Sequence, residues 1–217
     1  MMNHLPAAAK APTLLLALVA LVGCGGASSP PAKVLLIPGG GWVTGNAADV
    51  EEHRQLLAEK GYEVRVVGYD KDSLDSVPRT IEQYDPQVII GFSAGGQLGV
   101  IHGQDAKCVV TVAAPLNLRY EFAPTVARYV AAYAGIPADP RLNPAEHFKA
   151  GVKYIAFNNY YDEVVPIDSI RQLGRARPNV EFNTVYHNEA PDGGHNLPVS
   201  VINELILDGM EKCEQQT

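Results

Sequence analysis

The most informative segment of this chain reads Gln87-Val88-Ile89-Ile90-Gly91-Phe92-Ser93-Ala94-Gly95-Gly96-Gln97-Leu98-Gly99-Val100-Ile101-His102. Its apolar run at residues 88–90 is typical of a buried strand. The motif G-x-S-x-G follows at residues 91–95, and the apolar residues after it can open a helix. A strand, a sharp turn and a helix in this order would hold the hydroxyl of Ser93 clear of the backbone. The alternative interpretation is a glycine-rich turn between two buried elements, because the motif alone also arises by chance.

Composition indicates one globular α/β domain. The chain has 217 residues, of which 47% are hydrophobic and 19% charged, and this is enough to bury a sizeable core. The formal net charge is -7 and no basic run or basic-aromatic patch is present, so we expect no nucleic-acid partner. The sequence contains no H-E-x-x-H motif, no cysteine pair at ligand spacing and no Asp-rich calcium loop, so we expect no metal and no cofactor.

Apolar strands alternate with helical segments along the chain. Continuous apolar strands are typical of a parallel sheet that is covered on both faces. The fold class that we predict is therefore three-layer α/β, with a compact, mostly parallel sheet between helices. We expect strands at 33–37, 62–67, 88–90, 108–112, 152–157 and 180–186, and helices at 49–60, 77–84, after Ser93, at 125–133, 167–173 and 197–212.

The first residues have the features of an export signal. Lys10 precedes a short apolar core, Thr13–Val22, which is shorter than the ~20 residues of a membrane-spanning helix. The core ends in Leu21-Val22-Gly23-Cys24, which resembles the lipobox of bacterial lipoproteins. That resemblance implies a signal peptide over 1–23, cleavage before Cys24 and lipidation of Cys24. The alternative is an ordinary signal peptide that is cut near Ala27.

The expected organisation follows from this signal. Residues 24–32 would form a flexible tether rich in glycine, serine and proline, and residues 33–217 would form the domain. The protein would be exported and anchored by lipid to the bacterial envelope. Because Gly25 rather than aspartate follows Cys24, the outer membrane is expected in a cell with two membranes. Cys108 and Cys213 could pair in such an oxidising compartment, but their spacing leaves the pairing open.

Four sites in a fixed order resemble the α/β-hydrolase superfamily, and within it small esterases with a triple-glycine oxyanion loop. The resemblance covers residues 33–213 and implies that Ser93 is the nucleophile. His195, in Asp192-Gly193-Gly194-His195-Asn196, would be the base. Asp162, in Tyr160-Tyr161-Asp162-Glu163-Val164-Val165-Pro166, would orient it. The order Ser, Asp, His is the one that this superfamily uses. His187 is the rival base, and Glu163, Asp168 and Asp192 are the rival acids.

The oxyanion hole would use the segment Pro38-Gly39-Gly40-Gly41-Trp42. By resemblance, the N–H groups of Gly40, Gly41 and Ala94 would bind the oxyanion. Many relatives have histidine before the three glycines, so Pro38 removes a side chain that often braces this loop. A phosphate-binding loop is the alternative, but the Gly-Lys-Ser/Thr ending and the G-x-G-x-x-G spacing are both missing.

The resemblance implies a serine hydrolase that acts on carboxylic esters through an acyl-enzyme. The chain has no long insertion that would form a large lid, which favours short acyl or acetyl esters of a small molecule or a polysaccharide. A peptidase, thioesterase or lipase could use the same three residues. The other alternative is a lipid-anchored binding module that has lost activity.

Overall fold

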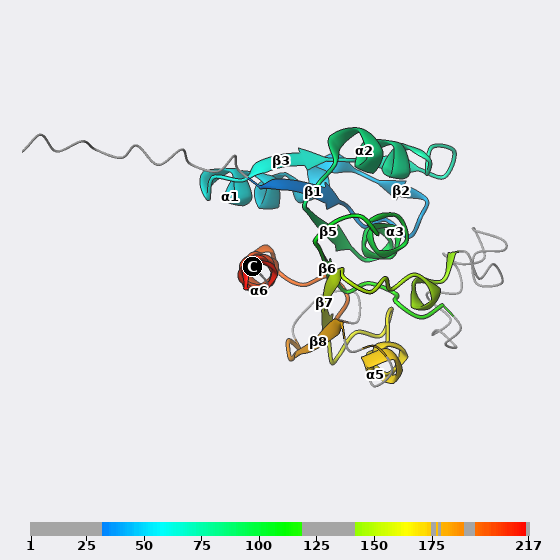
Figure 1. The fold of residues 1–217 in the computed structure, drawn as a ribbon. Coiled ribbons are helices and arrows are strands. Elements are labelled where there is room, and N and C mark those ends of the chain that lie inside the picture. Colours follow the sequence, from blue (N-terminus) through cyan, green and yellow to red (C-terminus); the bar gives the residue numbers. More distant parts are fainter. Residues whose placement is uncertain (1–31, 119–141, 175–176, 178, 189–193, 216–217) are drawn as a thin grey trace, which may run out of the picture. The chain divides into compact units, whose positions relative to one another are not determined.

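A parallel sheet lies at the centre of the part of the chain that the structure describes (Figure 1). This computed structural model describes residues 32–118, 142–174, 177, 179–188 and 194–215. Within them, six strands pair in the order β3-β1-β5-β6-β7-β8, each parallel to its neighbour. The strands are β1 (Lys33–Ile37), β3 (Glu63–Val66), β5 (Val88–Phe92), β6 (Cys108–Val112), β7 (Lys153–Asn159) and β8 (Val180–Val185).

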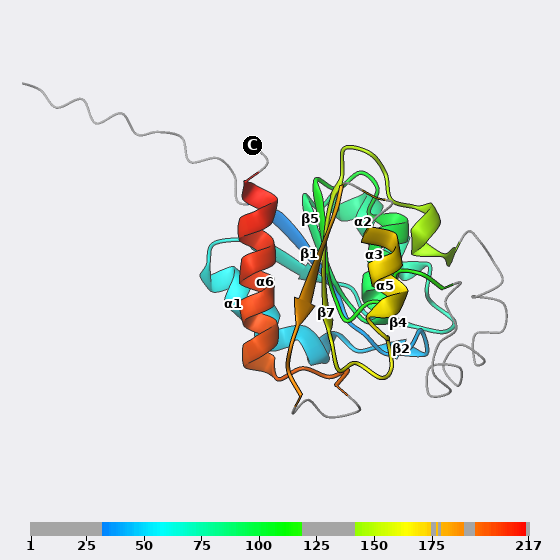
Figure 2. The ribbon, with the colours of Figure 1, turned by 90° about the horizontal axis from the view of Figure 1, so that it is seen from below.

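Helices cover both faces of this sheet, so the predicted three-layer α/β fold is confirmed. In Figure 2, α1 (Glu51–Glu59) and α6 (Val199–Glu214) lie on one face. The other face carries α2 (Ser76–Tyr84), α3 (Ala94–His102) and α5 (Asp168–Gly174). Strand β1 shows why its sequence is apolar after Lys33: Val34 and Leu36 pack in the core on the α1 and α6 side, while Leu35 and Ile37 pack in the other core. A strand buried on both faces has no position left for a polar residue.

The expected helix over 49–60 is divided in the structure. A 3-10 turn, η1 (Ala47–Val50), precedes α1, and the side chain of Asn46 caps it by accepting the N–H of Ala48. Within α1, His53 is buried whereas Ala58 is exposed. The imidazole of His53 stacks on Phe92 and its Nδ1 lies 2.7 Å from Oδ1 of Asn203, so its polar atom keeps a partner inside the core.

A second, two-stranded sheet was not predicted. Strands β2 (Thr44–Gly45) and β4 (Tyr69–Asp70) pair in antiparallel fashion, within segments that the sequence indicates as loops. Each strand has two residues, too few to give an alternating pattern. This small sheet lies directly after the triple glycine and therefore determines where that loop can go.

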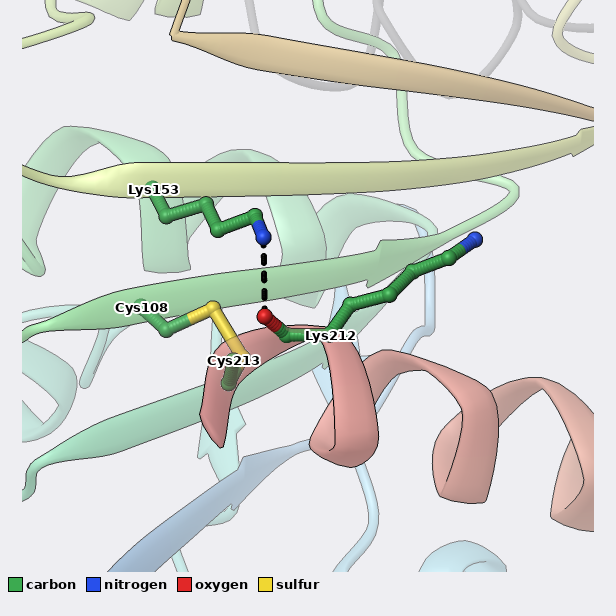
Figure 3. The surroundings of a disulfide bond; sticks show 4 residues. All are labelled: Cys108, Lys153, Lys212 and Cys213. Atoms are coloured by element: carbon green, nitrogen blue, oxygen red, sulfur yellow. Dashed lines mark hydrogen bonds between the residues drawn. A yellow bond between two sulfur atoms is a disulfide. The ribbon is translucent and has the colours of Figure 1, made fainter. Parts of the chain in front are cut away.

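A disulfide joins Cys108 to Cys213, a pairing that the sequence left open. Cys108 is the first residue of β6, and Cys213 lies in the last turn of α6, so the bond fastens the closing helix to a central strand (Figure 3). Beside it, the ammonium group of Lys153 donates to the backbone carbonyl of Lys212 at 2.8 Å (Figure 3). The bond lies at the amino end of β6, the end opposite to that reached by Ser93.

Several expectations fall on residues that the structure does not describe. These are the signal peptide over 1–23, Cys24, the tether except residue 32, the helix at 125–133 and Asp192. A short 3-10 turn, η3 (Pro144–Glu146), follows the undescribed residues 119–141. Of the helices that are described, none is both long and apolar enough to cross a membrane.

Candidate active site

Ser93 occupies the turn between β5 and α3, as the motif predicts. Its backbone has φ 48° and ψ −123°, a conformation that is strained for any residue with a Cβ. The Ser93 N–H donates to the carbonyl of Val112 at 2.9 Å, which fixes the turn to β6. Gly95 is required here because a Cβ at this position would lie 2.3 Å from the carbonyl oxygens of Ile37 and Pro38. The turn therefore presents the serine while the helix behind it packs tightly on β1.

His195 and Asp162 reach Ser93 from the loops after β8 and β7. Nε2 of His195 lies 3.0 Å from Oγ of Ser93, and Nδ1 lies 2.8 Å from Oδ2 of Asp162. A carboxylate only accepts hydrogen bonds, so the proton of the neutral imidazole belongs on Nδ1, and Nε2 is left to accept the serine O–H. The structure thus brings the three residues that the sequence proposed into one hydrogen-bonded chain.

The carboxyl group of Asp162 is held firmly by its own loop. Its side chain is fully buried, and Oδ1 accepts the N–H groups of Val164 at 2.8 Å and Val165 at 2.7 Å. These two bonds leave Oδ2 for His195. A buried anion with three donors is well suited to orient an imidazole and to stabilise it when it becomes charged.

Three of the four rival residues are described, and none of them takes part in this hydrogen-bonded chain. His187 is held through its backbone, and His195 is the histidine that contacts Ser93. Glu163 is exposed, and Asp168 is exposed and forms an ion pair with Arg171 at 3.5 Å.

The triple-glycine loop runs directly beside the serine. A Cβ added at Gly39 would lie 3.2 Å from Cβ of Ser93, which shows how closely the loop passes. Gly40 has φ +122°, and its carbonyl accepts the N–H groups of Val43 at 3.1 Å and Thr44 at 3.3 Å. Within the described residues, the N–H groups of Gly40, Gly41 and Ala94 have no hydrogen-bond acceptor. Unpaired N–H groups next to a serine are the donors that an oxyanion needs.

Two side chains that were not predicted from sequence, those of Tyr69 and Gln97, help to hold this loop. The hydroxyl of Tyr69, in β4, donates to the carbonyl of Gly39 at 3.1 Å. The indole N–H of Trp42 donates to Oε1 of Gln97 at 3.0 Å, and the amide of Gln97 donates to the carbonyl of Leu142 at 2.6 Å. These contacts brace the loop. The signal that could have found Gln97 is a lone amide inside an otherwise apolar helix.

The arrangement carries the elements of nucleophilic chemistry. Among the residues described, no group of three or more His, Cys, Asp or Glu side chains is placed to hold a metal ion. A serine next to an oriented imidazole can give up its proton as it attacks an electrophilic carbon. Strands β1, β5, β7 and β8 are parallel, so the loops that carry these groups meet at one edge of the sheet.

Comparison with known proteins relates this geometry to a fold. No protein-family profile matches the chain, and no curated protein matches its sequence. Solved structures do match. An acetyl ester-xyloside bifunctional hydrolase from Caldicellulosiruptor lactoaceticus superposes with a TM-score of 0.66 at 18% identity, over 87% of this chain and 82% of that one.

Two further matches have the same character. Esterase 2 of Thermogutta terrifontis, phosphonylated by sarin, gives a TM-score of 0.66 at 20% identity, over 86% of this chain and 84% of that one. A carboxylesterase from Lactobacillus plantarum gives 0.58 at 11% identity, over 84% and 86%. At these identities the likeness establishes the fold, which is that of the α/β-hydrolases.

Proposed function

We propose that this protein is a carboxylic ester hydrolase that works through an acyl-enzyme on Ser93. The observation that carries the proposal is the chain of hydrogen bonds from Ser93 through His195 to Asp162, with the serine held at a strained turn. Three solved structures of the same fold are named as esterases or acetyl ester hydrolases, which supports an ester as the substrate.

The proposed reaction has two halves. Oγ of Ser93 attacks the ester carbonyl while Nε2 of His195 takes the hydroxyl proton, and the imidazolium then protonates the departing alcohol. In the second half, water loses a proton to His195 and attacks the acyl-enzyme, and Ser93 recovers its proton as the acid leaves. Asp162 keeps the imidazole in the required tautomer throughout.

The oxyanion of each tetrahedral intermediate would bind at the triple-glycine loop. The N–H of Ala94 and those of Gly40 and Gly41 are the proposed donors, which is supported by their lack of acceptors within the described residues. Donors that are already fixed in place need no reorganisation when charge develops on the oxygen. The bonds from Tyr69 and Trp42 would keep this loop in place between turnovers.

The acyl group that we propose is short, such as acetyl or propionyl. The Caldicellulosiruptor protein is named as an acetyl ester-xyloside bifunctional hydrolase, and esterase 2 of Thermogutta terrifontis has a structure named for bound propionate. The alcohol would be a small molecule or a sugar of a polysaccharide.

We also propose that the domain over 33–217 is exported and tethered to the envelope by lipid on Cys24. The lipobox-like sequence carries this part of the proposal. The Cys108–Cys213 disulfide supports it, because disulfides persist in oxidising compartments such as the periplasm.

A fluorophosphonate probe tests the proposal directly, since esterase 2 of Thermogutta terrifontis is itself phosphonylated by sarin. We expect the probe to label the wild-type protein and not Ser93→Ala, and a panel of p-nitrophenyl esters to show turnover only in the wild type. The panel should include acetyl, propionyl and octanoyl groups, with thioester and peptide substrates beside it. A folded wild-type protein that takes no label and turns over no ester would favour a binding module instead.

A further inference from the structure

Asn159, the last residue of β7, forms its side-chain hydrogen bonds with the loop that carries His195. The residue is 1% exposed. Its Nδ2 donates to the carbonyl of His187 at 2.8 Å and to that of Gly194 at 2.9 Å, and its Oδ1 accepts the N–H of His187 at 3.0 Å. Three of the four hydrogen bonds open to an amide are therefore directed to this one loop.

These bonds fix both ends of the segment that delivers the histidine. His187 lies two residues after the end of β8, and Gly194 directly precedes His195. A β-strand would normally hold such a segment by backbone pairing, but β8 ends at Val185. The amide of Asn159 takes over that function, since it pairs with both the N–H and the carbonyl of His187 as a neighbouring strand would.

The same residue also contacts the loop of the acid. The N–H of Asp162 donates to the backbone carbonyl of Asn159 at 3.2 Å. Asn159 thus connects to the Asp162 loop through its backbone and to the His195 loop through its side chain. The distance between Nδ1 of His195 and Oδ2 of Asp162 depends on both connections.

We propose that Asn159 is a positioning residue that holds His195 in line with Ser93 and Asp162. The inference rests on the proposed function for its catalytic consequence, but its structural content stands without a substrate. Without the amide, the carbonyls of His187 and Gly194 and the N–H of His187 would lose their partner, and the loop would settle elsewhere. A displacement of about 1 Å of a catalytic group can cost about 10²-fold in rate.

The neighbouring residue Asn158 provides a matched control. It is 2% exposed and lies in the same strand, but its side-chain oxygen and nitrogen have no hydrogen-bond partner among the described residues. Asn158→Ala therefore removes the same atoms from β7 without releasing the histidine loop. Asn159→Asp keeps the shape of the residue and replaces the donating NH₂ with an oxygen that faces two carbonyls, so it separates lost donors from lost volume.

The kinetic test compares the wild type, Asn159→Ala, Asn159→Asp and Asn158→Ala on p-nitrophenyl acetate. Fluorophosphonate titration counts the active sites, so that kcat is expressed per titrated site. We expect kcat per site to fall about 10- to 100-fold in both Asn159 variants, with KM nearly unchanged, and to be retained in Asn158→Ala. A residue that only stabilised the fold would instead lower the number of active sites and leave kcat per site normal, and that result would overturn the proposal.

Proton NMR gives a readout that needs no substrate. The Nδ1–H of His195, bonded to Asp162, should give a downfield resonance that His195→Ala removes. We expect this resonance in the wild type and in Asn158→Ala, and its loss or broadening in Asn159→Ala and Asn159→Asp. If it is absent from the wild type or persists unchanged in both Asn159 variants, the positioning role is wrong. If the wild type hydrolyses no ester, the proposed function fails while this comparison still decides the role of Asn159.

Discussion

The two candidate histidines differ at the level of single atoms. His195 places Nε2 at 3.0 Å from Oγ of Ser93, whereas the hydrogen bonds of His187 to Asn159 use backbone atoms only. We expect His195→Ala to reduce kcat for p-nitrophenyl acetate by at least ~10³-fold, the scale of losing a member of a catalytic triad.

The control for this prediction is His187→Ala, which leaves the backbone bonds to Asn159 in place. Its kcat should stay within a few-fold of the wild type in the same steady-state assay. A larger loss in His187→Ala than in His195→Ala would assign the base to His187.

A second prediction at this scale concerns Gly40. Its φ of +122° disfavours any residue with a side chain, and a Cβ would lie 1.7 Å from the carbonyl oxygen of Thr44. Gly40→Ala must therefore move the loop away from Ser93. We expect kcat/KM to fall by at least about 10²-fold, the cost of losing an oxyanion donor, while circular dichroism shows an intact fold.

Gly61 offers the comparison that isolates the clash from the backbone strain. Its φ is +91°, but a Cβ there would have nothing within 4 Å. Gly61→Ala should cost roughly 1 kcal/mol of stability and leave kcat/KM unchanged. Equal activity in Gly40→Ala and the wild type would mean that the glycine loop takes no part in the reaction.

At the scale of elements, His102 at the end of α3 makes the free energy of unfolding depend on pH. Burial of the imidazole and the nearby His147 lower the pKa of His102, the last residue of this helix, below its ordinary value of 6.5. Below pH 6.5 the unfolded chain therefore binds a proton at this site that the folded chain does not bind. The free energy of unfolding must fall as the pH drops through this range.

The variant His102→Gln removes this term. Thermal unfolding measured from pH 8 to pH 5 should show a smaller loss of Tm in His102→Gln than in the wild type. Parallel curves for the two proteins would show that His102 titrates alike in the folded and unfolded states.

Elements that bury apolar side chains were predictable from sequence, and those set by distant partners were not. Strands β1 and β6 have the expected bounds because each is a short run in which four of the five residues are apolar. Strands β2 and β4 were missed because two residues carry no period, and only their pairing with each other defines them. The buried imidazole of His53 has its partner in Asn203, 150 residues away, which no local pattern reveals.

The candidate site divides along the same line. Ser93, Asp162 and His195 could be named because each lies in a local motif after a strand. Asn159, Gln97 and Tyr69 could not, because their roles arise from hydrogen bonds to loops that are 28 to 55 residues away in the chain. The sequence signal for Asn159 is an amide side chain at the end of a mostly apolar strand.

The whole molecule is expected to be anchored to a membrane through Cys24. Metabolic labelling with an alkynyl fatty acid should mark the wild-type protein in bacterial cells and should not mark Cys24→Ala. Ser93→Ala serves as the control, since loss of the proposed nucleophile leaves the lipobox intact and labelling should persist. Lipid that remains on Cys24→Ala would show that another residue carries it, and a wild type without label would favour the ordinary signal peptide cut near Ala27.

The disulfide links stability of the whole domain to its redox environment, and it should do so without affecting the chemistry. Cys108 and Cys213 are 105 residues apart, and the chain-entropy argument assigns about 4.7 kcal/mol to closing a loop of about 100 residues. A reductant should therefore lower the urea midpoint of the wild type markedly. The variant that combines Cys108→Ala with Cys213→Ala should have a low urea midpoint that does not change when reductant is added.

The disulfide should not affect activity. Because the bond lies at the amino end of β6 and Ser93 lies at the opposite edge of the sheet, kcat at 25 °C should match the wild type both in the reduced protein and in the double variant. A large loss of kcat in a variant that remains folded would show that the bond also shapes the active site, and the separation of the two edges would then be wrong.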